Sequence, residues 1–344
     1  LKALPYQLTD AQKQAVEDID RDLQSPERML RLVQGDVGSG KTIVAFLAMV
    51  QVVEAGYQSA LMAPTEILAR QHYERLYPLA QAAGLRLALL TGRDKGKSRK
   101  ALLDQLAAGE IDLLVGTHAL FQDDVVFKAL GLAVIDEQHR FGVHQRLALS
   151  RKGQAVDVLV MTATPIPRTL VLTFFGDMDV SVLREKPAGR QTIDTRTIRL
   201  DRSQEVIDGL ERALASGQQI YWICPLVEEN EELDLTAVNA RFKSLAERFG
   251  HQTGLLHGQM PAADKDAAMQ DFASGKTRLL VATTVVEVGV DVPNASVMVI
   301  EHAERFGLSQ LHQLRGRIGR GSAKSTCLLL YASDAGQIAR ARLE

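Results

Sequence analysis

Short apolar runs alternate with longer amphipathic stretches along most of this 344-residue chain. Within the longer stretches, apolar residues recur at helical spacing, and each stretch closes with a glycine near its C-terminal end, as helices commonly do. Strands that alternate with helices predict a parallel sheet that helices cover on both faces. In the first half, strands are predicted at residues 29–34, 59–64, 86–92, 112–117, 132–137 and 157–164, and helices at 42–56, 66–84 and 98–110.

The alternation is interrupted once and then restarts. Residues 182–193 (VLREKPAGRQTI) contain a proline, a glycine and mixed charge, which is typical of a linker. We therefore expect an α/β protein of two domains, residues 1–184 and 193–344, joined by a linker at residues 185–192. The strands predicted for the second half are residues 219–226, 252–258, 278–284, 296–302 and 325–331.

The composition is that of an ordinary soluble globular protein, with 46% apolar and 24% charged residues. The longest nearly apolar run, residues 43–53, is too short to cross a bilayer, and the first residues lack the pattern of a secretory signal. Both cysteines, Cys224 and Cys327, lie in apolar runs, so we expect buried thiols in a reducing cytoplasm rather than a disulfide. A net charge of −2 argues against a uniformly basic surface but leaves room for a local basic groove.

One glycine-rich loop has the pattern of a phosphate-binding site. Residues 34–42 (QGDVGSGKT) follow a predicted strand, precede a predicted helix and match the spacing G-x-x-x-x-G-K-[ST]. Glycines let the backbone approach phosphate oxygens closely, and the N–H groups at the start of the helix point at the anion. The lysine is expected to reach the β- and γ-phosphates, and the threonine hydroxyl to bind Mg²⁺. The predicted nucleotide-binding residues are Gly35, Asp36, Val37, Gly38, Ser39, Gly40, Lys41 and Thr42.

Two adjacent carboxylates end the predicted strand at residues 132–137. Four apolar residues, LAVI, precede Asp136 and Glu137, which places both carboxylates at the C-terminal edge of a parallel sheet, where ligands bind. We expect Asp136 to bind Mg²⁺, directly or through water, and Glu137 to polarise the attacking water. Beside a phosphate loop, these roles are favoured over an ordinary solvated strand end.

A glycine-spaced group of arginines lies near the C-terminus, in QLHQLRGRIGRG (310–321). Glycines between the arginines indicate a tight backbone that directs guanidinium groups one way. Arginine presented to a γ-phosphate stabilises the charge of the transition state. If Arg317 and Arg320 reach from the second domain to nucleotide on the first, hydrolysis is coupled to domain closure, which favours a motor.

Seven motifs, in this order, resemble those of the superfamily 2 helicases: GDVGSGKT, APTEILARQH, VGTHAL, DEQH, MTATPIPR, ATTVVEVGVDVPNA and QLRGRIGR. The longer runs GTHALFQ, IDEQHRFGVHQR and TVVEVGVDVPNASVMVIE resemble the RecG family of branched-DNA helicases in particular. The resemblance spans essentially the whole chain. It implies two tandem RecA-like domains and an ATP-dependent DNA helicase or translocase that remodels stalled replication forks and Holliday junctions in recombination and repair.

The resemblance implies roles for further residues in both domains. The expected nucleotide contacts are Gln12 at the adenine, with Tyr6 stacking nearby, and Gly289 and Asp291 from the second domain. The second-domain residues expected to act in hydrolysis are Gln313, Arg317 and Arg320. The residues expected to couple the nucleotide site to the DNA surface are His139, Thr162 and Thr164, the last two flanking Ala163.

The expected DNA contacts lie at predicted strand ends, where backbone N–H groups and hydroxyls can meet phosphates without reading the base sequence. Residues 92–100 (GRDKGKSRK), with five basic residues against one aspartate, are expected to add electrostatic attraction for DNA. The expected DNA-binding residues are Pro64, Thr65, Gly92, Thr117 and His118 in the first domain, and His257, Thr283 and Thr284 in the second.

The resemblance also implies cofactors, partners and a place in the cell. ATP and Mg²⁺ are expected at the nucleotide site, and forked, branched or single-strand/duplex junction DNA as the partner. A monomer in the bacterial cytoplasm, associated with the nucleoid and with a single-stranded-DNA-binding protein but not with a membrane, is expected. The family has an N-terminal wedge domain and a C-terminal hairpin element. We expect the wedge and most of the hairpin element to be missing from this chain, and therefore expect ATPase activity with impaired fork specificity and unwinding.

The residues leave two alternative functions open. The translocase module of a transcription-repair coupling factor shares MTATPIPR and a similar arginine motif, but resembles DEEQRFG where this chain has DEQHRFGVHQR. A phosphate-loop ATPase that acts as a switch without motor action would not need a second α/β domain with an arginine motif. An RNA helicase and a non-catalytic DNA-binding module are less favoured.

Overall fold

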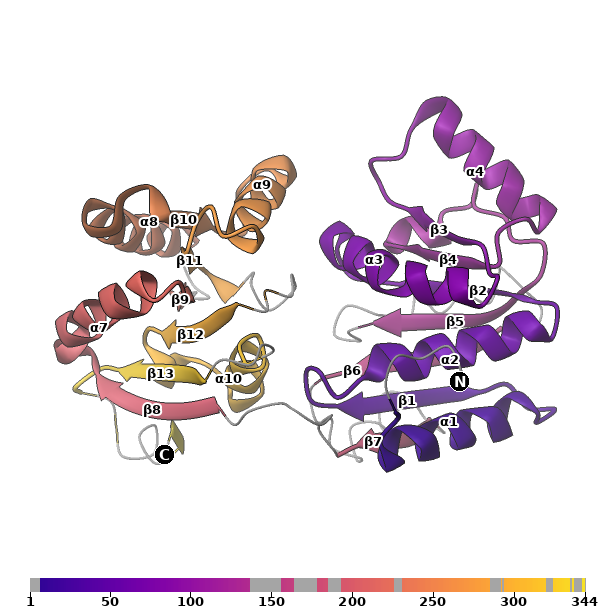
Figure 1. Cartoon of the computed structure of the whole chain (residues 1–344), viewed down its shortest axis with the longest axis horizontal. Coiled ribbons are helices and arrows are strands. Elements are labelled where there is room, and N and C mark those ends of the chain that lie inside the picture. Colours follow the sequence, from indigo (N-terminus) through magenta and orange to yellow (C-terminus); the bar gives the residue numbers. More distant parts are fainter. Residues whose placement is uncertain are drawn as a thin grey trace. The chain divides into compact units, whose positions relative to one another are not determined.

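The computed structural model describes residues 7–136, 156–163, 178–184, 193–225, 231–284, 292, 294–319, 324–334, 336 and 342–343. The chain divides into two compact units, unit 1 (Leu1–Pro187) and unit 2 (Ala188–Glu344). Within the described residues, every strand pairing in both sheets is parallel, and helices flank each sheet (Figure 1). The predicted α/β fold class is confirmed.

Unit 1 is built on a sheet whose described strands run in the order β3-β4-β2-β5-β6-β1-β7. Its strands are β1 (Leu30–Gly35), β2 (Gln58–Met62), β3 (Leu87–Leu90), β4 (Leu113–Gly116), β5 (Leu130–Asp136), β6 (Asp157–Thr162) and β7 (Asp179–Leu183). Its helices are α1 (Asp10–Leu23), α2 (Lys41–Glu54), α3 (Glu66–Ala82) and α4 (Gly96–Ala108), with the 3-10 turn η1 (His118–Phe121).

The strand order decides which face of this sheet each helix covers. From β1 through β2 to β3 the chain moves one way across the sheet, and from β3 to β4 it moves back. Because parallel crossovers are right-handed, α2 and α3 lie on one face and α4 on the other. Consistent with this, α2 packs on β1, β2 and β5, and α3 packs on β3 and β4. Leu106 of α4 is buried in the apolar cluster of the opposite face.

Unit 2 repeats the design with the strand order β10-β11-β9-β12-β13-β8. Its strands are β8 (Ile193–Arg199), β9 (Gln219–Ile223), β10 (Thr253–Leu256), β11 (Leu279–Ala282), β12 (Ala295–Ile300) and β13 (Ser325–Tyr331). Its helices are α7 (Ser203–Ala215), α8 (Glu231–Phe249), α9 (Ala262–Ala273) and α10 (Leu308–Arg315), with 3-10 turns η3 (Leu200–Arg202), η4 (Gly250–Gln252) and η6 (Ala303–Arg305).

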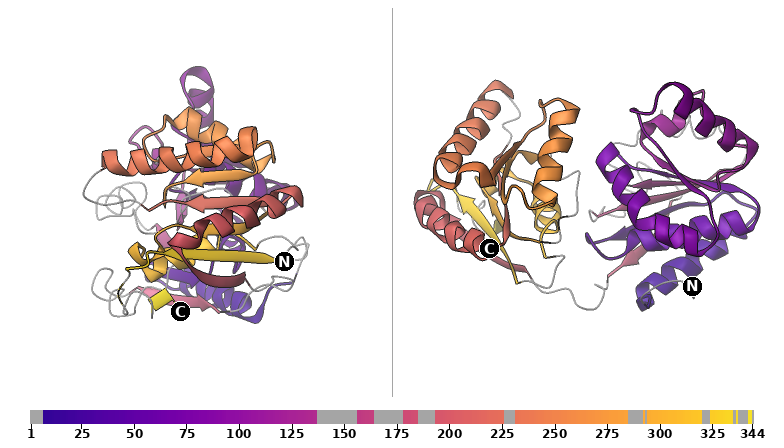
Figure 2. Two further views of the ribbon diagram at one scale, coloured as in Figure 1. Left: turned by 90° about the vertical axis from the view of Figure 1, so that its left-hand side faces the viewer. Right: turned by 45° about the horizontal axis from the view of Figure 1, so that its top comes forward.

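Two neighbouring residues of β9 show that both faces of the second sheet are covered. Successive strand residues point to opposite faces. Trp222 is fully buried in the cluster formed with α7 and α8, whereas Tyr221 packs against Phe272 of α9, with ring centroids 4.8 Å apart. Figure 2 shows unit 2 with helices on either side of its strands.

The structure adds three details to the predicted organisation. The strands β7 and β8 were not predicted, and each is the edge strand of its sheet. β7 ends shortly before the predicted linker, residues 185–192, and β8 begins directly after it, while the linker itself lies outside the described residues. α4 begins at Gly96, so the second half of the basic stretch 92–100 lies on a helix.

The cysteines behave as expected from their apolar surroundings. Cys224 and Cys327 are both buried and free of disulfide bonding. Burial raises the pKa of the Cys327 thiol to about 12, and it raises the pKa of Cys224 further, with a smaller contribution from the nearby Glu301 carboxylate. Both groups are therefore protonated at neutral pH. No helix among the described residues is both long enough and apolar enough to span a bilayer.

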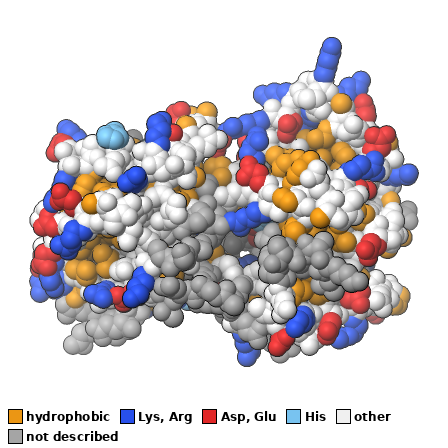
Figure 3. Space-filling view, in the orientation of Figure 1, with side chains coloured by type: hydrophobic (Ala, Val, Ile, Leu, Met, Phe, Trp, Pro, Cys, Tyr) orange, Lys and Arg blue, Asp and Glu red, His pale blue; other side chains and the backbone are white. Residues whose placement is uncertain are grey.

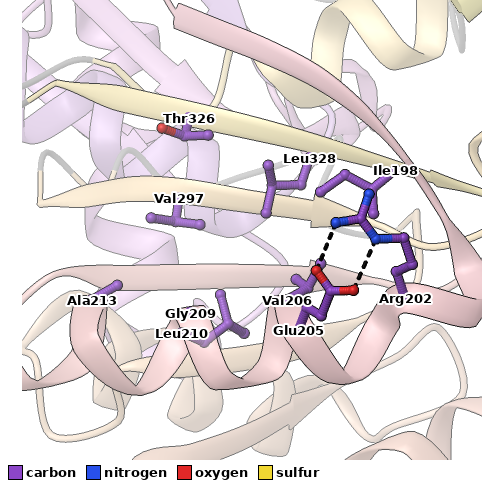
Figure 4. Close-up of a pocket in the computed structure, with 10 residues that line it drawn as sticks. All are labelled: Ile198, Arg202, Glu205, Val206, Gly209, Leu210, Ala213, Val297, Thr326 and Leu328. Carbon is purple, nitrogen blue, oxygen red and sulfur yellow. Dashed lines mark hydrogen bonds and ion pairs between the residues drawn. The ribbon is translucent and has the colours of Figure 1, made fainter.

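A pocket of about 310 Å³ lies beneath α7, on the face of the second sheet (Figure 4). At one end, Arg202 and Glu205 form an exposed ion pair at 2.7 Å. Gly209 lies in the middle of α7, and a Cβ atom there would meet only Arg212 Nη2, at 3.9 Å. There is therefore room for a small side chain at position 209 of α7. The pocket is lined by Ile198, Arg202, Glu205, Val206, Gly209, Leu210, Ala213, Val297, Thr326 and Leu328.

Replacing Gly209 with alanine is expected to stabilise unit 2. Alanine is favoured over glycine in a helix interior by about 1 kcal/mol, and the pocket accepts the added methyl group without a clash. Thermal unfolding of the Gly209→Ala protein should show a rise of a few degrees in Tm. Gly217→Ala is the matched control, because Gly217 has a φ of +82° just after α7 and should be destabilised by the same methyl group. An unchanged or lowered Tm for Gly209→Ala would contradict the packing described here.

Candidate nucleotide and DNA site

The phosphate loop connects β1 to α2 and leaves no room for side chains at its glycines. Gly40 has a φ of +87°, and a Cβ atom there would lie 2.2 Å from Gln12 Nε2. A Cβ atom on Gly35 would lie 2.6 Å from Ser39 Oγ. Gly38 also has a positive φ, of 80°. The loop is thus a tight backbone cradle that only glycine permits at these positions.

The start of α2 has the features of an anion site. Gly40 is its N-cap and offers no side-chain oxygen to the first N–H groups of the helix. The Lys41 ammonium lies over the loop and donates to the carbonyl oxygens of Gly35 (2.6 Å) and Asp36 (3.1 Å). The buried Ser39 hydroxyl has no hydrogen-bond partner among the described residues. A phosphate chain would meet the lysine, the backbone N–H groups and this hydroxyl together.

Gln12, the expected adenine contact, holds the phosphate loop in this structure. Its Nε2 donates to the carbonyl of Ser39 at 2.7 Å, and its Oε1 accepts from the Thr9 backbone N–H at 2.9 Å. Thr9 in turn caps α1, completing a capping box with Gln12. The side chain is buried, so its contact with adenine stays a prediction, while its contact with the loop was not predicted.

The register of the sheet brings Asp136 to the same edge as the phosphate loop. Asp136 at the end of β5 lies opposite Met161 of β6, and Met161 lies opposite Val33 of β1. With neighbouring strands about 4.8 Å apart, Asp136 lies about 10 Å from β1, two strands away. Thr162, the expected coupling residue, ends β6 between them and is fully buried.

The Asp136 carboxylate has a partner that the motifs did not indicate. His72 Nε2 lies 2.6 Å from Asp136 Oδ2, and the two side chains are only 8% and 12% exposed. An ionised carboxylate accepts hydrogen bonds and cannot donate them, so the imidazole donates its Nε2–H. His72 is the last residue of the motif APTEILARQH, for which no role was predicted, and it lies on α3, 64 residues from Asp136 in the chain.

The donor set fits a magnesium ion that arrives with a nucleotide. Among the described residues, no three His, Cys, Asp or Glu side chains group together as a metal site of their own. Mg²⁺ typically takes one or two protein ligands and completes its octahedron with phosphate oxygens and waters. Thr42, in the first turn of α2, and Asp136 are the two described residues expected to hold it, and both are partly accessible.

The expected DNA-binding residues all follow the carboxyl ends of strands. Gly92 and His118 are exposed, whereas the Thr117 hydroxyl is buried and caps η1. In unit 2, Thr283 Oγ1 and His257 Nδ1 are buried polar atoms without a hydrogen-bond partner among the described residues. Pro64 and Thr65 follow β2, Gly92 follows β3, Thr117 and His118 follow β4, His257 follows β10, and Thr283 and Thr284 follow β11.

Basic side chains of the stretch 92–100 are partly neutralised. Arg93 forms an ion pair with Glu66 at 2.8 Å, and Arg99 forms one with Asp124 at 2.8 Å. Figure 3 shows Lys and Arg side chains over the region of α4, with Asp and Glu side chains among them. The predicted electrostatic attraction for DNA therefore depends chiefly on the lysines of this stretch.

Only part of the arginine motif falls within the described residues. Gln313 lies on α10 and is half-buried, and Arg317, two residues after the helix, is 7% exposed. Their roles in hydrolysis stay predictions. The expected site residues outside the described part of the chain are Tyr6, Glu137, His139, Thr164, Gly289, Asp291 and Arg320.

A second buried carboxylate, for which no role was predicted, lies at the carboxyl edge of the second sheet. Glu301 follows β12 and accepts from Trp222 Nε1 at 2.9 Å and from Arg241 Nε at 3.1 Å, with a second bond from Arg241 Nη2. The Arg241 guanidinium also lies over the Trp222 ring, 5.2 Å from its centroid. These contacts tie α8 to β9 and β12. Such a charge pair stabilises mainly by leaving no buried group unpaired.

Models of two helicase families match the two units in turn. The DEAD/DEAH box helicase model matches residues 9–172, and the helicase conserved C-terminal domain model matches residues 203–322. Among curated relatives, the ATP-dependent DNA helicase RecG of Bacillus subtilis is 54% identical over 96% of this chain, and that of Synechocystis sp. is 53% identical over 99%. The chain covers 49% and 41% of these two proteins, so it spans at most about half the length of such relatives.

Solved structures agree with the family models. A structure of RecG bound to a three-way DNA junction matches 99% of this chain with a TM-score of 0.86 and 45% identity, while the chain covers 45% of that protein. S. cerevisiae Dbp5 bound to RNA and ADP BeF3 matches with a TM-score of 0.67 at 17% identity, which shows a shared fold alone. The paired parallel sheets, the phosphate loop and the matched models define a two-domain helicase core. Within this class, the chain belongs to the RecG family.

Adding a methyl group at Gly40 is expected to weaken nucleotide binding while the fold survives. The new Cβ would displace Gln12 and force the loop out of its cradle, in addition to the strain of a left-handed backbone. Gly56→Ala is the matched control, since Gly56 has a φ of +88° but no atom within 4 Å of a Cβ. We expect Gly40→Ala to lose affinity for a fluorescent ADP by at least tenfold, about 1.4 kcal/mol, and Gly56→Ala to keep it. Equal affinities in both variants would refute the cradle.

Proposed function

We propose that this chain hydrolyses ATP and uses the energy to move along branched DNA, as the motor core of a helicase that remodels stalled forks and Holliday junctions in recombination and repair. The observation that best supports the proposal is the likeness to RecG bound to a three-way DNA junction, at 45% identity over 99% of this chain. The closed glycine cradle beside Asp136 supports the ATPase part independently. A transcription-repair translocase is less well supported, because the curated relatives compared above are RecG proteins.

The first unit is proposed to bind ATP and the metal ion. The backbone N–H groups of the phosphate loop and Lys41 hold the phosphates, and Gln12 links the loop to the adenine region. Mg²⁺, when bound, would neutralise the negative charge that develops on the phosphates. Thr42 and Asp136 are the proposed residues that hold it, and Glu137 is proposed to orient and deprotonate the attacking water.

The second unit is proposed to complete the site when the two units close on ATP. Arg317 and Arg320 would present guanidinium groups to the γ-phosphate, with Gln313 beside them, and Gly289 and Asp291 would touch the nucleotide. Completion of the site by a second unit makes hydrolysis depend on closure, and release of product allows reopening. His139, Thr162 and Thr164 are the proposed link between nucleotide and DNA surfaces.

DNA is proposed to lie across the carboxyl edges of the sheets, on the strand-end residues described above. Contacts of this kind go to phosphates and sugars, so they suit a motor that must step over any sequence. We further propose that the chain acts as a monomer in the bacterial cytoplasm near the nucleoid, in contact with a single-stranded-DNA-binding protein. The bacterial sources of the relatives compared above support the cellular setting.

The proposal is tested by ATP hydrolysis without nucleic acid, with single-stranded DNA, with a model fork and with RNA of the same length. We expect DNA to raise the rate severalfold, and the fork to do so at least as well as the single strand. Lys41→Ala should abolish hydrolysis, because the phosphates lose their cation, whereas Lys13→Ala, which removes an exposed lysine paired with Asp10, should not. If none of the nucleic acids changes the rate of ATP hydrolysis, the result would favour a switch ATPase and contradict the proposed motor function.

Arg320→Ala is expected to slow hydrolysis by about 10³-fold or more while ATP still binds. The guanidinium stabilises charge that develops only in the transition state, so the ground-state complex loses little. Single-turnover hydrolysis and equilibrium binding of a fluorescent ATP analogue separate the two effects. The control is Arg199→Ala, which removes a half-exposed arginine paired with Asp201 in the same unit. Normal turnover by Arg320→Ala would rule out the finger assignment.

A further inference from the structure

The contact between His72 and Asp136 joins two parts of unit 1 that the motifs treat separately. Asp136 ends β5 at the nucleotide edge, and His72 lies on the second turn of α3. Their 2.6 Å hydrogen bond is shielded from solvent, and such a bond to an ionised acceptor is stronger in a buried site than in water. It restricts the rotation of the carboxylate that is proposed to hold Mg²⁺.

The other end of α3 is built from expected DNA contacts. The helix starts at Glu66, directly after Pro64 and Thr65, and Thr65 caps it by accepting from the Leu68 N–H at 3.4 Å. Glu66 holds Arg93 in an ion pair at 2.8 Å, and Gly92 lies so close that a Cβ atom there would be 3.3 Å from Glu66 Oε1. The expected DNA contacts after β2 and β3 thus meet at the N-terminus of one helix.

One helix, α3, therefore connects the expected DNA contacts at its N-terminus to the carboxylate that is proposed to hold the metal ion. Glu66 and His72 are six residues apart on α3, about 9 Å along the helix axis. A helix moves as a unit, because its backbone hydrogen bonds and the packing of its buried residues Leu68, Ala69, Leu76 and Ala80 resist local stretching. Any shift imposed at Thr65 or Glu66 reaches His72 with little loss.

We propose that His72 is a positioning residue that transmits the binding of DNA at the N-terminus of α3 to the Asp136 carboxylate. The inference rests on the proposed function, in that Asp136 must hold Mg²⁺ and the start of α3 must meet DNA. DNA contact at Thr65 and along the Arg93–Glu66 pair sets the position of α3, and His72 sets the orientation of the carboxylate. Hydrogen-bonding partners of metal ligands typically matter by about 10- to 100-fold in metal affinity or activity.

The proposal predicts a coupling that can be measured without turnover. Binding linkage is reciprocal, so DNA that repositions Asp136 must change the Mg²⁺ concentration at which nucleotide binds half-maximally. The measurement is the Mg²⁺ midpoint for binding of a fluorescent ADP, with and without a synthetic forked DNA. The electron paramagnetic resonance spectrum of Mn²⁺ bound with ADP gives an independent view of the same carboxylate.

Three variants separate the hydrogen bond from the packing of His72. His72→Phe keeps a ring but has no donor, whereas His72→Gln keeps an N–H at similar reach. His72→Asn carries the same amide one methylene shorter, so its N–H stops short of Asp136. Leu76→Ala removes a buried side chain one turn further along α3 without touching the bond. Thermal unfolding of each variant reports its loss of stability.

For His72→Phe and His72→Asn we expect the Mg²⁺ midpoint to rise by about 10- to 100-fold, the effect of DNA on it to vanish and the Mn²⁺ spectrum to change. His72→Gln should restore most of the wild-type behaviour. Leu76→Ala should lower Tm while the midpoint and its response to DNA stay unchanged. If His72→Phe unfolds, the comparison of the two amides decides the question by itself.

Several outcomes would overturn the proposal. They are a wild-type midpoint that DNA does not move, equal behaviour of the Gln and Asn variants, or a Leu76→Ala protein that reproduces the loss of coupling. The Asp136→Asn variant distinguishes a failure of the metal assignment from a failure of the role inferred for His72. If it leaves Mg²⁺-dependent binding intact, the metal assignment under the proposed function fails, and this inference fails with it. If it abolishes that dependence while the His72 variants behave as wild type, only the inference about His72 fails.

Discussion

Parallel pairing of strands is the constraint on which the layout of both units depends. A parallel strand can return to its sheet only through a crossover, so every strand ends at the same edge, and the loops that follow are gathered there. In unit 1 this aligns the phosphate loop after β1 with Thr162 at the end of β6 and Asp136 at the end of β5. Groups from distant parts of the sequence thus lie on one surface because of the sheet topology, and not because they contact one another. The backbone hydrogen bonds between parallel strands therefore determine which side chains are available together at that edge.

The elements that the sequence predicted well are those buried on both faces. The strands β4 and β11 are continuous apolar runs, and all of their residues are buried, as are those of β2. The edge strand β8, IDTRTIR, failed to stand out because its side chains are mostly exposed and its place is decided by backbone bonds to β13. A charged exposed strand and a charged loop have the same composition. Only pairing, which is not local, distinguishes them.

The candidate site also has features that are local in the sequence and features that depend on contacts between distant residues. The phosphate loop stands out in the sequence, because its residues lie within one short segment and its glycines meet a local requirement of the backbone, while its binding of nucleotide stays a prediction. The bond of His72 to Asp136 crosses 64 residues, and that of Trp222 to Glu301 crosses 79. Neither pair has a spacing that signals contact, because the topology of the sheet brings them together. Gln12 was assigned to adenine by its motif, yet its amide is engaged with the loop.

The chain has one tryptophan, and it lies in the interior of unit 2 beneath a guanidinium and beside a carboxylate. Its indole fluorescence therefore originates from unit 2 alone, while unit 1 contributes no tryptophan emission. Unfolding of the second half can be followed by emission wavelength in the intact protein, and compared with circular dichroism, which averages over both halves. The chain thus contains its own optical label for asking whether its halves melt together or in succession.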